Sequence, residues 1–162
     1  NMDNRERSPQ RGRWADREFV LRQIADTPSC GWPPPQVLHN ASEDLRGDKE
    51  VVLQAVQKNG TALQFASEDL KADRQVVLVA VRSRGEALQY ASASLRSERD
   101  VVLEAVSHGS DGLQVAKEEF KADVGIVLAA VRASPYAWEH AAAHCRANRE
   151  IVFQALRACP YS

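Results

Sequence analysis

One short pattern returns along this chain at a fixed spacing of 25 residues. Each copy starts at an apolar residue and continues through a polar stretch. Two branched apolar residues and a large apolar residue follow, and an alanine comes two positions later. The copies start at Leu45, Leu70, Leu95, Phe120 and Cys145. Periods in this range are typical of stacked-repeat proteins, whose units bury their apolar faces only against their neighbours. The sequence therefore predicts an all-α fold of short helical hairpins stacked as an α-solenoid.

The period also predicts the organisation of the chain. We expect a polar N-terminal tail at residues 1–13 and a single array at residues 14–162. Complete copies occupy residues 45–69, 70–94, 95–119 and 120–144, and a partial copy occupies residues 145–162. The first copy, residues 14–44, is degenerate, because a proline-rich loop at residues 26–36 lengthens it. Proline has no amide hydrogen and a fixed φ, so this loop is not expected to be helical.

Each copy is predicted to form two helices of about ten residues, judged from the apolar spacing. In the copy at residues 70–94, Asp73 can cap the first helix by accepting hydrogen bonds from amides of the first turn. The matching residues are Asp16, Asp48, Glu98, Asp123 and Asn148, and only the glutamate is a poor cap. Gly60 and Gly85 are expected to end first helices in the left-handed conformation.

The net charge, the length of the apolar runs and the cysteine count exclude several classes of partner and location. The formal net charge is −1 and the isoelectric point is near 6.5, so we expect no nucleic-acid partner, which would need a basic face. No apolar run reaches the roughly 20 residues of a membrane-spanning helix, so we expect no membrane insertion. The three cysteines, Cys30, Cys145 and Cys159, are too few for a secreted disulfide framework. We expect an intracellular location, cytoplasmic or organellar.

Two blocks carry a resemblance to a known family. They are Asp-x-x-Val-Val-Leu-x-Ala-Val and Gly-x-Ala-Leu-Gln-Tyr/Phe-Ala-Ser-x-x-Leu, which agree in order and spacing over residues 48–94 and more loosely over residues 95–156. The chain resembles the tandem-repeat family known only as domain of unknown function 4116. The resemblance implies a helical-repeat fold and transfers no catalytic residue. Gly112, Pro135 and Trp138 depart from the pattern, where alanine, glycine and leucine are usual.

The sharpest chemical candidate is a pair of histidines. His140 and His144 are four residues apart, a spacing that places both on one face of a helix, with Cys145 beside them. Such a pair can chelate a divalent metal, although a stable site needs three or four ligands. The alternative is that His140 and Cys145 occupy positions that other copies fill with packing residues, and this alternative is favoured. We expect no cofactor and no enzymatic activity.

The leading hypothesis is a non-enzymatic module that binds protein, either as an accessory subunit or as the repeat region of a scaffold. Residues that vary while the core repeats are the candidates for partner binding: Gln57, Lys58, Arg82, Arg84, His108, Phe65, Tyr90 and Trp32. Aromatic and arginine side chains make good interface anchors. The alternatives are a targeting array of an enzyme whose catalytic part lies elsewhere, metal binding at His140 and His144, and an RNA-binding repeat.

Overall fold

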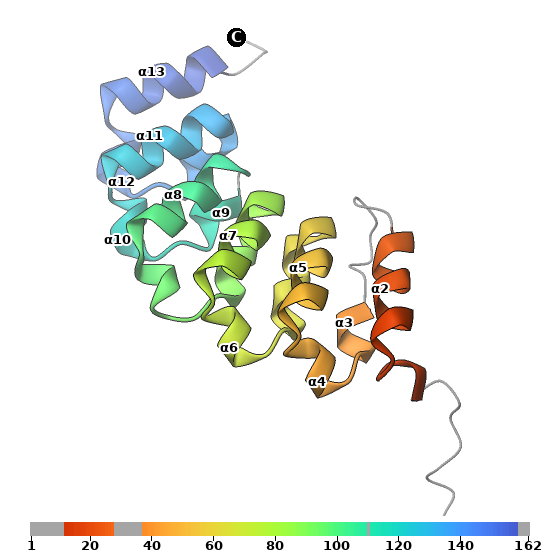
Figure 1. Cartoon of the computed structure of the whole chain (residues 1–162). Helices are drawn as coiled ribbons and strands as arrows, with labels where there is room; N and C mark the ends of the chain where they lie inside the picture. The colour runs from red at the N-terminus through yellow and green to blue at the C-terminus, as the bar shows by residue number, and fades with distance from the viewer. Residues whose placement is uncertain (1–11, 28–36, 110, 159–162) are drawn as a thin grey trace, which may run out of the picture.

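The computed structural model describes residues 12–27, 37–109 and 111–158 (Figure 1). These residues form helices and turns and contain no β-strand, which confirms the predicted all-α class. The long helices are α2 (Arg17–Asp26), α5 (Lys49–Lys58), α7 (Arg74–Ser83), α8 (Arg99–Ser107), α11 (Val124–Ala133) and α13 (Arg149–Ala158). The short α-helices are α3 (Val37–Asn40), α4 (Glu43–Arg46), α6 (Glu68–Lys71), α9 (Asp111–Gln114), α10 (Glu118–Lys121) and α12 (Ala143–Arg146). The 3-10 segments are η1 (Gly60–Phe65), η2 (Gly85–Tyr90), η3 (Leu95–Ser97) and η4 (Pro135–His140).

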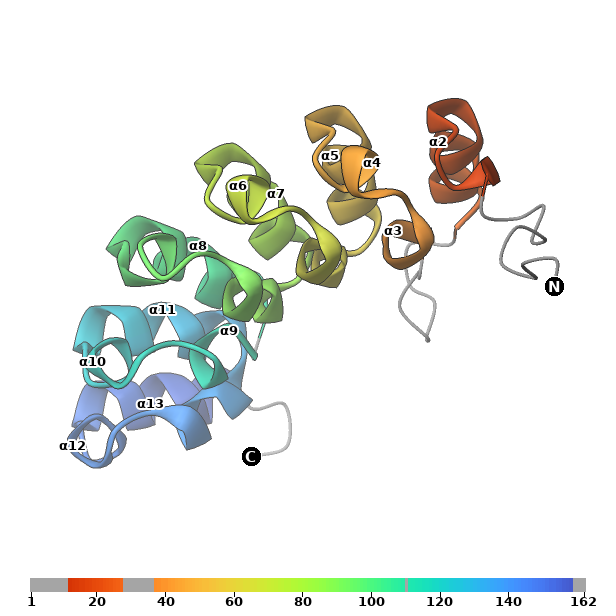
Figure 2. The same ribbon diagram turned by 90° about the horizontal axis from the view of Figure 1, so that it is seen from below.

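The long helices pack against one another in chain order. α2 contacts α5, and the series continues through α7, α8 and α11 to α13. The short segments join neighbouring long helices, since η1 contacts both α5 and α7, and η2 contacts both α7 and α8. The elements follow a curved path, and the two ends of the described chain lie far apart along it (Figure 2).

The starts of the long helices match the predicted capping. Oδ1 of Asp73 accepts hydrogen bonds from the amides of Gln75 and Val76, at 2.9 and 3.2 Å. Asp16, Asp48, Asp123 and Asn148 accept equivalent bonds. Glu98 makes no such bond, because its longer side chain does not fold back onto the first turn. The predicted caps and the predicted exception are both confirmed.

The repeated apolar positions form the core. In α7 the buried residues are Val76, Val77, Ala80 and Val81, all with no exposed surface. Leu88 and Ala91 of the same copy and Leu95 at the start of the next are also buried, as predicted. Valine lowers helix propensity by a few tenths of a kcal/mol, whereas burial of each side chain contributes about 1.5–3 kcal/mol. Burial therefore decides that the Val-Val-Leu runs form helices.

The prediction of a second ten-residue helix in each copy is wrong. After α5 this part consists of η1, an extended residue at Ala66 (φ −68°, ψ 158°) and the single turn α6, which runs into the next copy. The break frees the amide of Ser67, which donates to the carbonyl of Arg46 in the preceding turn at 2.9 Å. The amides of Ser92 and Ala142 make equivalent bonds to the carbonyls of Lys71 and Lys121, each at 2.9 Å. Backbone hydrogen bonds between the first turn of a copy and its later part thus replace bonds within one helix.

The predicted role of the glycines is also wrong. α5 ends in an extended Asn59 (φ −150°, ψ 111°), and Gly60 follows as the first residue of η1 without a positive φ. A Cβ atom on Gly60 would lie 2.2 Å from the carbonyl oxygen of Ala80 in α7. On Gly85 it would lie 2.4 Å from the carbonyl oxygen of Ala105 in α8. Gly60 and Gly85 are required because η1 and η2 touch the backbone of the following long helix.

Candidate functional site

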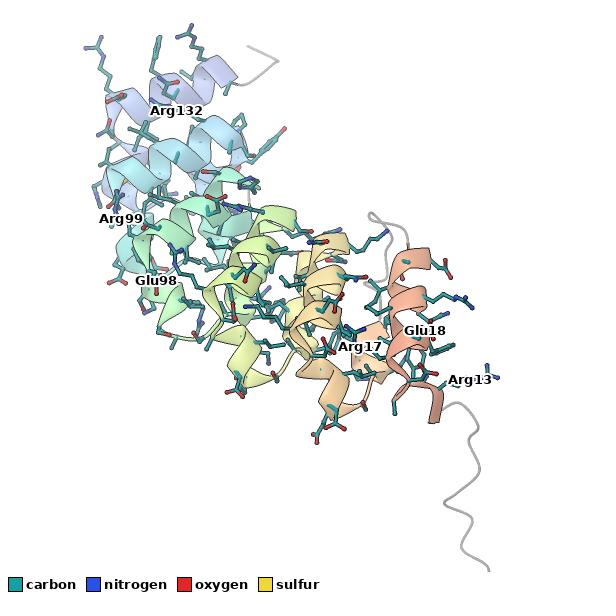
Figure 3. All side chains as sticks on the ribbon, viewed as in Figure 1. Arg13, Arg17, Glu18, Glu98, Arg99 and Arg132 are labelled. Carbon is teal, nitrogen blue, oxygen red and sulfur yellow. The ribbon has the colours of Figure 1, made fainter. Side chains whose placement is uncertain are left out.

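Charged side chains connect the starts of α2, α5, α7 and α8 with the cap position of the next long helix. Nζ of Lys49 donates to Oδ2 of Asp73 at 2.7 Å, and Nη2 of Arg99 donates to Oδ1 of Asp123 at 3.2 Å. The pairs Arg17–Asp48, at 2.9 Å, and Arg74–Glu98, at 3.3 Å, complete the series, which we call the ion-pair ladder. Figure 3 labels Arg17, Glu98 and Arg99 of this ladder. Each partly exposed pair contributes about 0.2–1 kcal/mol.

The ladder and the caps shift the titration of three aspartates. The hydrogen bond from Lys49 holds the pKa of Asp73 below its usual value, with help from the backbone amides. For Asp123 the amide of Ile126 is the largest cause of a lowered pKa, and Arg99 adds to it. Burial alone would raise the pKa of Asp48, but bonds from Arg17 and two amides outweigh it and lower the pKa. These carboxylates favour the folded state while they are charged.

The ladder stops before α13. At the next step Val124 occupies the position of the lysine or arginine and is 37% exposed, and Asn148 occupies the position of the aspartate. Asn148 still caps α13 by accepting from the amide of Glu150 at 2.9 Å. The junction between α11 and α13 therefore keeps its cap and lacks the charge pair of the earlier junctions.

The predicted binding residues at the ends of the long helices lie along one edge and are partly engaged within the chain. Gln57, Arg82 and His108 are exposed, and Lys58 and Arg84 are half-buried. Nε of Arg82 donates to Oε1 of Glu104 at 2.5 Å, and Nδ1 of His108 lies 2.9 Å from the Glu104 carbonyl oxygen. Nζ of Lys58 donates to the carbonyl of Ala25 at 3.3 Å, and Arg84 pairs with Glu86 at 3.5 Å. Several of these side chains thus join neighbouring elements.

The predicted aromatic residues are anchored against the core. Phe65 and Tyr90 are half-buried and pack on buried residues, and the Phe65 ring meets His39 edge-on at 5.1 Å. Trp32 lies outside the described residues. Trp14, at the N-terminal side, packs against the core and meets Phe19 edge-on at 5.3 Å. Phe65 and Tyr90 each present only part of their surface to a partner.

The structure separates the two histidines. His140 ends η4, Ala141 is extended (φ −74°, ψ 151°), and His144 lies in α12, so the prediction that both share one helical face is wrong. Nε2 of His144 lies 3.0 Å from the carbonyl oxygen of Ala122 and 3.4 Å from Sγ of Cys145. Within the described parts of the chain, no group of three or more histidine, cysteine, aspartate or glutamate side chains could hold a metal ion.

Cys145 is a packing residue. Its side chain has no exposed surface and occupies the position that Leu70 and Leu95 fill in earlier copies. Burial raises the pKa of the thiol, and the charge of Asp123 raises it further. Since the thiolate is the reactive form, this thiol is poorly reactive at neutral pH.

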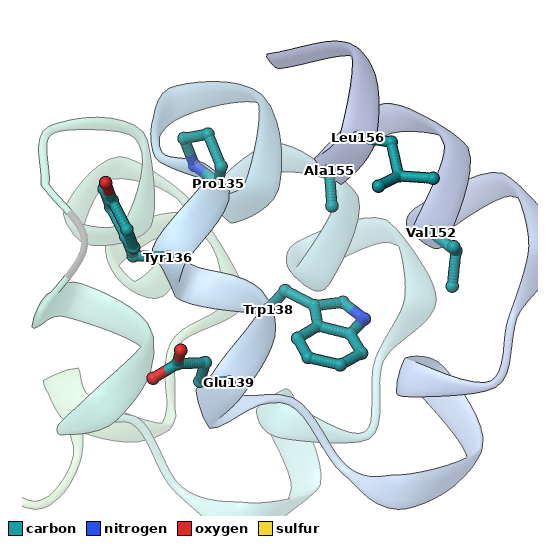
Figure 4. A pocket seen from close by; sticks show the side chains of 7 residues that line it. All are labelled: Pro135, Tyr136, Trp138, Glu139, Val152, Ala155 and Leu156. Atoms are coloured by element: carbon teal, nitrogen blue, oxygen red, sulfur yellow. The ribbon is translucent and has the colours of Figure 1, made fainter. Parts of the chain in front are cut away.

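A further apolar surface lies at the C-terminal end of the described chain. A pocket of about 390 Å³ opens between η4 and α13, and we call it the terminal groove. Its lining residues are Pro135, Tyr136, Trp138, Glu139, Val152, Ala155 and Leu156. Figure 4 shows the Trp138 ring between the two elements, on the side of Ala155 and Val152. Tyr136 is 69% exposed and Leu156 is 58% exposed, and Phe153, which also lies in α13, is 60% exposed.

The equivalent positions in earlier copies are closed. Val131, Val106 and Val81 match Leu156 at intervals of 25 residues, and all three have no exposed surface. Ala130, which matches Ala155, is also fully buried, whereas Ala155 is half-buried. The inner side of α13 is packed normally, because Ile151 is fully buried. Only the outer face of α13 is left uncovered by the described residues.

Two residues that line this surface differ from the repeat pattern. Pro135 occupies the position of Gly60 and Gly85, and its side chain prevents the close backbone approach that glycine allows. Trp138 replaces a leucine that is fully buried in the other copies, and it remains only partly buried. Its Nε1 atom is buried and has no hydrogen-bond partner among the described residues. Both departures are visible in the sequence, but the groove depends on how α13 sits against them.

Comparison with known proteins identifies one family. The chain matches the family described as Domain of unknown function (DUF4116) in two tandem segments, residues 16–71 and 73–121. The two segments cover more than half of the chain, and the chain belongs to this family. No curated protein and no solved structure matches the chain significantly. Among the described residues, no helix combines the length and the apolar composition needed to cross a membrane.

Proposed function

We propose that the chain is an α-solenoid of 25-residue helical units that acts as a non-enzymatic protein-binding module. The spacing of the long helices supports the unit length, because Lys49, Arg74, Arg99, Val124 and Arg149 begin successive long helices at intervals of 25 residues. The contact of each long helix with the next in the chain supports the stacked arrangement.

One observation carries the binding role. Tyr136 and Leu156 are more than half exposed and line an apolar pocket, and Phe153, on the same helix as Leu156, is also more than half exposed. Clusters of exposed apolar side chains mark interaction sites in folded proteins, since exposure to water is otherwise unfavourable. The exposed Arg82 and His108 offer a second, polar surface at the ends of α7 and α8.

A capture experiment tests this role. The immobilised chain is incubated with an extract of its source, and bound proteins are quantified by mass spectrometry. Three double variants serve as probes: Arg82→Glu with His108→Glu, Phe65→Ala with Tyr90→Ala, and Phe153→Asp with Leu156→Asp. We expect a near-stoichiometric partner that at least one double variant releases. A chain that captures no protein, or a partner that all three variants retain, contradicts the proposed binding role.

A further inference from the structure

The short segments that follow the long helices form a second layer of the array. α3, η1, η2, α9 and η4 contact one another in chain order, and we call them the inner segments. Figure 2 shows α3 and α9 on the inner side of the curved path. Curved repeat arrays offer an extended inner surface to partners, because one partner can contact several copies there.

A row of side-chain amides recurs along the inner segments. Gln64, Gln89 and Gln114 each follow the fully buried leucine of their segment. Gln89 and Gln114 are exposed, and Gln64 is half-buried. None of the three side chains has a hydrogen-bond partner among the described residues. A glutamine amide both donates and accepts, so it can pair with either the N–H or the C=O group of a partner backbone.

The spacing of this row fits an extended partner chain. Packed helices lie about 8–10 Å apart. An extended or polyproline chain advances about 3.1–3.4 Å per residue, so about three of its residues span one copy of the array. The backbone groups of an α-helix pair with one another, and a helical partner would offer the amides few main-chain bonds.

The charges in the inner segments have one sign. None of these five described segments contains a lysine or an arginine. Glu86, Asp111 and Glu139 place one carboxylate each in η2, α9 and η4. Arg84, just before η2, balances part of this charge by pairing with Glu86 at 3.5 Å. The inner segments therefore complement a positively charged partner.

A pocket beside η1 has the same character. It has a volume of about 240 Å³ and brings the Phe65 ring together with Glu43 and Glu68. Arg46 is the only cation among its lining residues. The Glu43 and Glu68 side chains are 93% and 88% exposed, so both carboxylates are accessible. The pocket offers an aromatic surface to an aliphatic stem and two carboxylates to a cationic head.

We infer that the inner segments bind an extended segment of another protein that carries lysine or arginine side chains. The inference rests on the proposed protein-binding function and names the class of partner. The backbone of the segment pairs with the amides of Gln64, Gln89 and Gln114, and its cationic side chains face the carboxylates. In the pocket beside η1, the stem of a lysine packs on Phe65 and its ammonium group meets Glu43 and Glu68.

A synthetic peptide of simple composition serves as the probe. It consists of four Lys-Ala-Pro repeats, because proline keeps the chain extended and a triplet supplies each copy of the array with one lysine. The control peptide consists of four Glu-Ala-Pro repeats. Each peptide carries a fluorophore and is titrated with the full chain by fluorescence anisotropy. We expect saturable binding of the lysine peptide, weakened by salt, and at least about tenfold weaker binding of the glutamate peptide.

Paired variants of the chain test the amides. Gln89→Ala with Gln114→Ala removes two amides of the row, whereas Gln54→Ala with Gln75→Ala removes two amides from the long helices α5 and α7. Gln89 and Gln114 are exposed, so this variant is expected to keep the circular dichroism spectrum and the urea midpoint. We expect the first pair to weaken binding of the lysine peptide at least about fivefold and the second pair to change it less than about twofold.

A second set of variants tests the charges. Glu43→Gln with Glu68→Gln removes the two carboxylates of the pocket beside η1. Glu18→Gln with Glu150→Gln changes the net charge equally, in the first turns of α2 and α13. We expect the first pair to weaken binding of the lysine peptide at least about fivefold and the second pair to change it less than about twofold.

Three results overturn the inference. One is the absence of saturable binding of the lysine peptide. Another is equal binding of the lysine and glutamate peptides. The third is binding that either inner-surface variant leaves unchanged, since the peptide then lies on another part of the chain. If the captured protein partner persists while the lysine peptide fails to bind, the proposed function stands and only the inner surface is wrong.

Discussion

The junction between α5 and α7 and the junction between α11 and α13 use the same positions of the sequence pattern with different residues. In the first, Gly60 lets η1 touch the carbonyl of Ala80, and Lys49 pairs with Asp73. In the second, Pro135 and Val124 occupy the positions of the glycine and the lysine. The first junction is closed on every side, and the second leaves an apolar groove. η2 covers the first junction, whereas none of the described elements covers the outer face of α13.

The largest expected difference is in the free energy of unfolding when leucine is replaced by alanine in each of the two regions. Leu88→Ala removes a fully buried side chain and is expected to lower the free energy of unfolding by about 2–5 kcal/mol. Leu156→Ala removes a side chain that is 58% exposed and is expected to change it by less than about 0.5 kcal/mol. Urea denaturation followed by circular dichroism measures both. Equal losses contradict the distinction between a closed and an open junction.

A second difference concerns the contact between the backbone of a 3-10 segment and the backbone of the next long helix. Gly60→Ala forces a methyl group against the carbonyl of Ala80 and is expected to cost about 1–3 kcal/mol. Gly47→Ala is the matched control, because its Cβ has ordinary contacts, the nearest at 3.4 Å, and other copies have Ala72 and Ala122 there. The control is expected to be neutral or slightly stabilising. A neutral Gly60→Ala in the same denaturation assay contradicts the proposed contact.

The same two regions show which features of the fold can be predicted from the sequence and which cannot. The long helices, the aspartate caps and the buried Leu63 and Leu88 depend on local spacing, and the sequence predicts them correctly. The break at Ala66 depends on a bond to the carbonyl of Arg46 at the start of the same copy, and the requirement for Gly60 depends on the carbonyl of Ala80 in the next copy. Local propensity suggested a helix and a left-handed cap instead. These long-range contacts override local preference in each copy.

The candidate site was predicted less well for a related reason. Variable residues such as Arg82 and His108 are exposed as expected, but bonds to Glu104 engage both of them. The terminal groove arises where a repeated contact is missing, and a missing contact has no sequence motif of its own. Only the replacements at Pro135 and Trp138 indicate it.

Acid is expected to weaken the closed junctions. The pKa values of Asp48, Asp73 and Asp123 are lowered in the folded chain, so their contribution is complete above the ordinary aspartate value of about 3.9 and is lost as the pH falls below it. We expect the urea midpoint to fall between about pH 5 and pH 2. Asp73→Asn keeps a capping side chain and removes one titrating group, so its pH dependence should be shallower. An identical pH profile in this variant contradicts the role of Asp73.

The smallest expected effect comes from extending the ion-pair ladder to the last junction. Val124→Lys with Asn148→Asp recreates the pair formed by Lys49 and Asp73 and is expected to stabilise the chain by about 0.2–1 kcal/mol. A double-mutant cycle with the two single variants isolates the pairwise energy. The gain should disappear at high salt because the pair is exposed. A coupling of zero at low salt shows that the α11–α13 junction does not align as the earlier ones do.

Hydrogen exchange of the isolated chain, followed by mass spectrometry, tests the central contrast most directly. Amides of residues 76–81 in α7 lie between covered faces, whereas those of residues 151–156 in α13 lie in a helix covered on one side. Local opening needs less free energy where fewer apolar contacts must break. We expect residues 151–156 to exchange much faster than residues 76–81. Equal, strong protection of both helices contradicts an open α13.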